Sequence, residues 1–141
     1  MREFSAEYLE TTRAGMWADS REALADLDLS ARERVLDVGC GTGELTRVLR
    51  EESPAEVVGL DADRGLLESV DPPRLQGDAL SLPVADDSFD LVVCQALLVN
   101  LPDPAAAVAE FARVSTDLVA AIEPNNAAVS VTSSADPEAR L

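Results

Sequence analysis

The chain has 141 residues, of which 11 are basic and 27 acidic, giving a formal net charge of −16 at neutral pH. Every basic residue is an arginine, and the absence of His removes the commonest general base and metal ligand. With only Cys40 and Cys94, the chain can build neither a zinc site of Cys and His ligands nor a disulfide framework. The length indicates one domain, since about 150 residues per domain is typical, and 47% hydrophobic residues suffice for a core.

The sequence predicts a cytoplasmic protein that does not enter the membrane. No apolar run approaches the roughly 18 residues that a membrane span needs, and residues 1–7 lack the apolar region of a signal peptide. The acidity has three interpretations: repulsion of nucleic acid, docking of a basic partner, or adaptation to concentrated salt. The acids are spread along the whole chain, and the Lys-free, Asp-rich composition resembles that of proteins from halophilic microbes. We therefore expect the charge to reflect the solvent more than a partner.

Three regions follow one another along the chain. Residues 1–30 are predicted to form a helical segment, with Ser5 capping a first helix and Asp19 or Ser20 capping a second. Residues 31–123 form the core, in which short apolar runs alternate with helical patterns. Strands are expected at 35–38, 56–61, 74–78, 89–94 and 118–122, and helices at 44–52, 64–70 and 104–114. Residues 124–141 are a weakly patterned tail in which a short strand near 129–132 is possible.

The alternation predicts an α/β fold with an open parallel sheet and right-handed crossovers. The continuous apolar runs at 91–94 and 118–122 indicate strands that are covered by helices on both faces.

A glycine-rich loop follows the first predicted strand. Gly39, Gly41 and Gly43 alternate between this strand and the next helix, where a parallel sheet binds ligands. Glycine there permits a positive φ and a close approach of the backbone to a ligand. The spacing differs from the G-x-G-x-x-G of dinucleotide sites, because Glu44 stands where the third glycine would be. With Asp37 just before the loop, these residues favour a ligand with a positive end and no phosphates.

Carboxylates end the second and third predicted strands. Asp61 can accept two hydrogen bonds from a ribose diol, or it could cap the next helix, a role for which Asp63 is better placed. Asp78 can accept a hydrogen bond from an adenine amino group, and the small Ala79 leaves room for a flat ring. The alternative for Asp78 is a polar turn.

Together these blocks resemble the class I S-adenosylmethionine-dependent methyltransferases, over about residues 33–123. The resemblance rests on Val35–Gly43, Val57–Asp61 and Gly77–Ala79, and on the stretches at 82–92 and 97–104. It implies a Rossmann-like fold with helices on both faces of the sheet, S-adenosyl-L-methionine as the cofactor, and no metal. The residues that it implies for cofactor binding are Asp37, Gly39, Cys40, Gly41, Gly43, Asp61, Ala62, Asp78, Ala79, Cys94 and Gln95.

The chain departs from the family pattern in two places. Many relatives have histidines after the fourth strand, whereas this chain has Asn100 there, so a His-assisted mechanism is not expected. The family fold also ends with two antiparallel strands, and the tail after Glu123 is too short for both with their connections. We expect this pair to be missing or incomplete, through truncation or through completion of the edge by a second copy. A homodimer could form through the sheet edge or the N-terminal helices.

The expected function is methyl transfer to an unidentified acceptor. A small molecule is favoured, because no basic, aromatic-interleaved patch for nucleic acid is visible. The candidate acceptor contacts are Tyr8, Arg13, Trp17, Gln95 and Asn100. The alternative is a module that binds the cofactor but lacks a competent acceptor site. The glycine spacing and the absence of Lys disfavour an NAD-dependent oxidoreductase, and the two cysteines are expected to be small buried residues.

Overall fold

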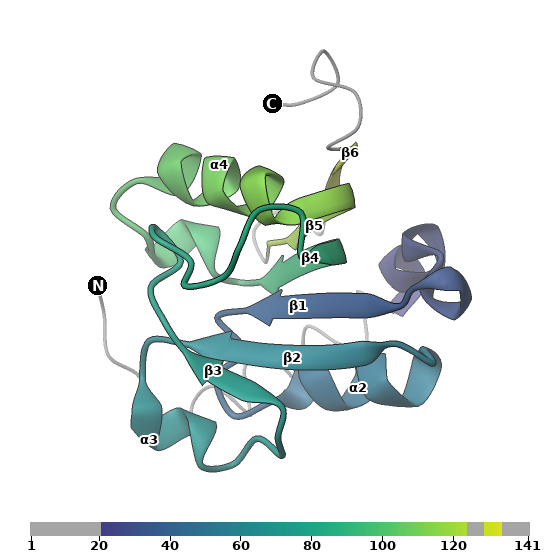
Figure 1. The fold of residues 1–141 in the computed structure, drawn as a ribbon, viewed down its shortest axis with the longest axis horizontal. Helices are drawn as coiled ribbons and strands as arrows, with labels where there is room; N and C mark the ends of the chain where they lie inside the picture. Colours follow the sequence, from purple (N-terminus) through teal and green to yellow (C-terminus); the bar gives the residue numbers. More distant parts are fainter. Residues whose placement is uncertain (1–20, 124–128, 134–141) are drawn as a thin grey trace.

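A computed structural model describes residues 21–123 and 129–133 of the chain. Its centre is one sheet of six strands in the order β3-β2-β1-β4-β5-β6 (Figure 1). The first five strands of this order are parallel, and β6 runs antiparallel to β5. The strands are β1 Arg34–Val38, β2 Glu56–Asp61, β3 Arg74–Gln76, β4 Phe89–Gln95, β5 Ser115–Ile122 and β6 Val129–Ser133. The prediction of an open, Rossmann-like α/β fold is confirmed.

The helices match the predicted positions more closely in the core than near the N-terminus. In α4, Pro104 takes a first-turn position and the Asp103 carboxylate accepts a hydrogen bond from the Ala106 N–H. The helix predicted over 64–70 is shorter, and the second N-terminal helix is a 3₁₀-helix. The helix predicted from Ser5 lies outside the described residues. The helical elements are η1 Arg21–Leu27, η2 Leu29–Ala31, α2 Glu44–Glu52, α3 Arg64–Leu67, η3 Leu98–Asn100 and α4 Pro104–Val114.

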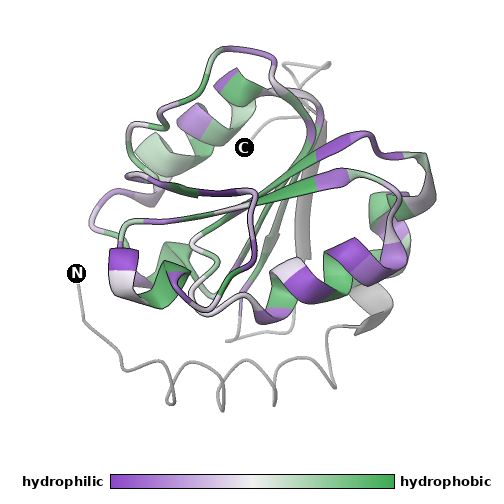
Figure 2. Cartoon of the chain, turned by 60° about the horizontal axis from the view of Figure 1, so that its bottom comes forward, coloured by the Kyte–Doolittle hydropathy of each residue, from purple (hydrophilic) through white to green (hydrophobic). Residues whose placement is uncertain are grey.

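Helices cover both faces of the sheet, as predicted. Phe111 and Val114 of α4 pack with Leu36 and Val92 on one face. On the other face, Leu45 and Leu49 of α2 and the leucines of η1 pack with the alternate residues of the same strands. Hydrophobic and hydrophilic positions alternate along α2, whereas the central strands are mostly hydrophobic (Figure 2). Since side chains alternate between the faces of a strand, two-sided burial accounts for the continuous apolar runs.

Strand β6 forms the edge of the sheet beside β5, where the sequence predicts a missing or incomplete antiparallel pair. Its five residues pair antiparallel with β5, from Val129 opposite Ile122 to Ser133 opposite Leu118. The short strand considered near residues 129–132 is therefore a member of the main sheet. Within the described residues, one antiparallel strand follows the five parallel strands, so the expected C-terminal pair is represented by one of its strands.

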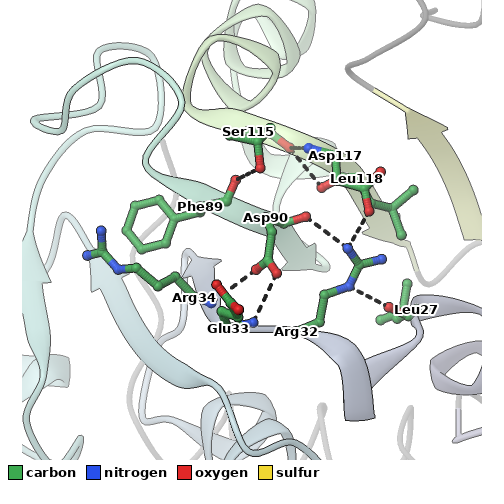
Figure 3. Close-up of polar contacts among 10 residues, drawn as sticks. Leu27, Arg32, Glu33, Arg34, Phe89, Asp90, Ser115, Asp117 and Leu118 are labelled. Carbon is green, nitrogen blue, oxygen red and sulfur yellow. Dashed lines mark hydrogen bonds and ion pairs between the residues drawn. The ribbon is translucent and has the colours of Figure 1, made fainter.

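A polar cluster closes the amino edge of the sheet (Figure 3). The buried Arg32 guanidinium donates to the Leu27 carbonyl at 2.8 Å, to the Asp90 carbonyl at 3.1 Å and to the Asp117 carboxylate at 2.5 Å. The Asp90 carboxylate in turn accepts from the backbone N–H groups of Glu33 and Arg34, at 2.9 and 3.0 Å. These contacts fix the starts of β1, β4 and β5. The loops that follow the parallel strands lie at the opposite edge of the sheet.

No helix in the described part of the chain combines the length and the apolarity needed to cross a membrane.

Candidate functional site

The candidate site lies at the carboxyl edge of the parallel strands. The strand order reverses between β1 and β4, because the chain runs outward from β1 through β2 to β3 and then returns to β4. In open α/β sheets, ligands bind outside the carboxyl ends of the strands at such a reversal. The loops after β1, β2, β3 and β4 all begin at this edge (Figure 1).

The glycine loop has the backbone geometry that the sequence predicts. Gly39, Gly41 and Gly43 have φ angles of 72°, 58° and 94°, a region that residues with a Cβ rarely adopt. The N–H groups of Gly39 and Cys40 both donate to the Leu60 carbonyl of β2, at 2.7 and 2.9 Å. The loop is therefore anchored to the neighbouring strand, and all three glycines are required by conformation.

Asp61 joins the end of β2 to the glycine loop. One carboxylate oxygen, Oδ2, accepts from the Gly41 N–H at 2.8 Å, and Oδ1 accepts from the Asp63 N–H at 2.8 Å. The cap of α3 is Asp63, whose carboxylate accepts from the N–H groups of Gly65 and Leu66 at 2.8 and 3.2 Å. The helix cap is therefore Asp63, whereas Asp61 braces the loop, and the ribose role of Asp61 remains a prediction. Each oxygen of Asp61 retains capacity for a second hydrogen bond.

The two acids that flank the loop have different surroundings. Asp37 is buried at 1% exposure, and its Oδ2 accepts from the Thr46 hydroxyl of α2 at 2.7 Å. Glu44 begins α2 and accepts from the Thr42 hydroxyl at 2.5 Å and from the Arg47 guanidinium at 3.1 Å. An anion at this helix N-terminus is favourable for the helix dipole and unfavourable for a phosphate.

The turn after β3 lies beside Asp61. The Gly77 N–H donates to the Asp61 carbonyl at 3.1 Å. Asp78 is exposed, and its Oδ1 accepts from the Leu80 N–H at 2.8 Å, so the polar turn considered for it is present. Ala79 is buried in the core beneath α4, whereas Ala62 is exposed at the end of β2. The assignment of Asp78 and Ala79 to the adenine, and of Ala62 to the cofactor site, remains a prediction.

The end of β4 contributes buried residues. Cys94 lies opposite Val38 of β1, and the next residue, Gln95, is 1% exposed. Cys40 is buried against Leu67 and Val70. Both cysteines are buried, as predicted.

Among the candidate acceptor contacts, Asn100 lies in η3 and its Nδ2 donates to the Ala96 carbonyl at 3.2 Å. Tyr8, Arg13 and Trp17 lie outside the described residues.

Two residues at this edge were not singled out from the sequence. Leu97 contacts the glycine loop, since a Cβ built on Gly39 would lie only 2.7 Å from Leu97 Cδ1. Glu123, directly after β5, accepts from the Val99 N–H at 3.0 Å through its Oε1. A signal for Glu123 was present, because an acid at the end of a predicted strand is the same pattern that identified Asp61.

The comparisons with known proteins agree on the family. A family model described as a methyltransferase domain matches residues 36–117, which is more than half of the chain. The chain belongs to the class I S-adenosylmethionine-dependent methyltransferases. The matched methyltransferase segment runs from β1 into β5 and contains the glycine loop, Asp61 and Asp78.

Individual relatives give the same picture. The chain is 36% identical over 107 residues to a demethylmenaquinone methyltransferase of Lactiplantibacillus plantarum, covering 67% of this chain and 45% of that protein. It is 34% identical over 134 residues to methyltransferase GfsG of Streptomyces halstedii, covering 77% and 48%. The solved structure of the YcgJ protein from Bacillus subtilis is similar with 30% identity and a TM-score of 0.66, covering 75% and 50%. This methyltransferase chain thus spans about half the length of the curated relatives it matches.

Proposed function

We propose that this chain binds S-adenosyl-L-methionine at the carboxyl edge of the sheet and transfers its methyl group to a small-molecule acceptor. The observation that carries the proposal is the bond between Asp61 and Gly41. It holds a carboxylate at the end of β2 next to three alternating glycines with positive φ. This combination suits a ligand that carries a ribose and approaches the backbone closely.

The residues at this edge fit the chemistry of the cofactor. Its sulfonium supplies the activated methyl group, so the protein mainly has to align the acceptor and exclude water. Asp61 has lone pairs left for the ribose hydroxyls, and the glycine loop, with the buried Asp37 beneath it, would take the methionine end. Asp78 and Ala79 would take the adenine. The remaining proposed contacts are Cys40, Ala62, Cys94 and Gln95.

The acceptor is proposed from the relatives. The curated relative from Lactiplantibacillus plantarum is named for demethylmenaquinone, which is a small molecule. Demethylmenaquinone is therefore the first acceptor to assay. No side chain of the described residues is assigned as a base. A sufficiently acidic acceptor would need none, which agrees with the absence of His from the chain.

The test is calorimetric titration of this chain with S-adenosylmethionine and with S-adenosylhomocysteine, using NAD as the control ligand. We expect saturable binding of the first two and none of NAD. Binding of NAD alone would overturn the assignment. Transfer from labelled cofactor to demethylmenaquinone then separates an enzyme from a binding module, because the module would bind the cofactor without transferring the methyl group.

A further inference from the structure

Glu123 reaches from the end of β5 to the backbone that follows β4. Its Oε1 accepts from the Val99 N–H at 3.0 Å. Burial raises the pKa of Glu123, and the nearby backbone N–H groups of residues 96–99 partly offset that effect.

The backbone held in this way is strained at its start. Ala96 has a φ of 54°, a left-handed conformation that is uncommon for residues other than glycine. Its N–H donates to the Ile122 carbonyl of β5 at 2.8 Å. Asn100 closes the turn through its backbone N–H to Leu97, at 3.0 Å, and through its side chain to Ala96. Such strain persists only where surrounding contacts impose it, and it is concentrated at functional sites.

The same stretch contacts the glycine loop. A Cβ on Gly39 would lie 2.7 Å from Cδ1 and 3.2 Å from Cδ2 of Leu97, so the leucine side chain packs directly on the Gly39 backbone. Glu123 therefore acts on residues 96–101, and these residues act on the loop through Leu97. We call residues 96–101 the cover segment.

We propose that Glu123 is a positioning residue that holds the cover segment against the glycine loop and thereby sets the affinity of the cofactor site. The inference rests on the proposed function, because it assumes that the loop binds the cofactor. Glu123 itself need not touch the cofactor. Its carboxylate fixes the backbone of the strained turn, and this backbone sets the position of the Leu97 side chain.

Three variants separate this role from a general contribution to stability. Glu123→Ala removes the acceptor, whereas Glu123→Gln keeps a side-chain oxygen that can accept from the same N–H groups. Asp117→Asn is the matched control, since Asp117 also belongs to the β5 region but contacts Arg32 at the amino edge. Each variant is titrated with S-adenosylhomocysteine by calorimetry and melted in the absence of ligand.

We expect Glu123→Ala to weaken binding about fivefold to tenfold, the effect of losing roughly one hydrogen bond. Glu123→Gln should recover most of the affinity, and Asp117→Asn should lower the melting temperature while leaving affinity within about twofold. An unchanged affinity in Glu123→Ala, or an equal loss in Asp117→Asn, would overturn the proposal.

A second variant and a ligand-free measurement cover the remaining outcomes. If Glu123→Ala does not fold, Leu97→Ala tests the same path, and wild-type affinity in that variant would refute it. Hydrogen exchange of the amides at 97–99 should be close to wild type in Glu123→Gln and faster than in wild type in Glu123→Ala. Unchanged exchange in Glu123→Ala removes the positioning role. If the wild-type protein binds no cofactor, the proposed function fails, and with it the proposal that Glu123 sets the cofactor affinity. The hydrogen-exchange measurement still decides whether Glu123 holds the cover segment.

Discussion

Replacing Asp61 by Ala removes a carboxylate that holds two backbone N–H groups at once. The Gly41 and Asp63 N–H groups each donate to it at 2.8 Å. Their surroundings differ, because Gly41 is buried and Asp63 is exposed. In the variant, water can hydrogen-bond to the exposed Asp63 N–H in place of the lost Asp61 carboxylate far more readily than to the buried Gly41 N–H.

The magnitude follows from this difference. An unpaired buried N–H costs about 1–3 kcal/mol, whereas an exposed one costs little, so we expect the free energy of unfolding to fall by about 1–3 kcal/mol. For a chain of 141 residues, each kcal/mol lowers the melting temperature by roughly 3–4 °C. If Asp61 also accepts from the ribose, losing a charged acceptor costs about 1.5–3 kcal/mol of binding, which is roughly a tenfold to hundredfold weaker affinity.

Asp63→Ala is the matched control for Asp61→Ala. Asp63 also accepts two backbone N–H bonds after the end of β2, but as the cap of α3 it accepts them from Gly65 and Leu66 and not from the glycine loop. Its loss should cost about 0.5–2 kcal/mol of stability and leave cofactor affinity unchanged. Thermal melts and calorimetric titration of both variants provide the comparison. Wild-type affinity in Asp61→Ala, or an equal loss of affinity in Asp63→Ala, would refute the ribose role.

Three further predictions concern the loop, pH and salt. Gly41→Val should abolish cofactor binding, because a β-branched residue is a genuine outlier at a φ of 58°; retained affinity in a calorimetric titration would show that the loop does not hold the ligand. The hydrogen bond from Arg113 lowers the pKa of Glu110. The ionised carboxylate therefore stabilises the fold at pH values above the ordinary glutamate pKa of about 4.3, and this stabilisation is lost as the pH falls from there through the lowered pKa. Denaturant unfolding should therefore be less pH-sensitive in Glu110→Gln, and parallel curves would contradict this. Stability should also rise between about 0.1 and 1 M salt, as the Debye length falls from about 10 to 3 Å, and a flat or falling titration would remove the salt-adaptation interpretation.

The glycine loop could be predicted because its sequence constrains the backbone directly. Alternating glycines between an apolar run and a helical pattern need no knowledge of distant contacts, and all three adopt a positive φ. The assignment of Asp63 as the helix cap succeeded for the same reason, since a cap bonds to N–H groups two and three residues ahead. Local chemistry was sufficient in both cases.

The missed features depend on partners far apart in sequence. Arg32 reads as one exposed arginine among many, yet it is buried because Asp117 and the Asp90 carbonyl lie beside it in the folded sheet. Glu123 reads as the polar end of a strand, and its partner Val99 comes from the loop after a different strand. Strand β6 is short, and only its pairing with β5 makes it part of the sheet.

The acidity also has a structural component that composition cannot reveal. Many carboxylates accept hydrogen bonds from backbone N–H groups in turns, caps and strand ends, so they do more than repel one another on the surface. Salt screens repulsion between exposed charges but does not replace these acceptors. Stability should therefore fall in acid through Glu110, whose pKa is lowered by the hydrogen bond from Arg113, even where salt has removed the repulsion. The acids in this group are Asp61, Asp63, Asp78, Asp90, Asp103, Glu110 and Glu123.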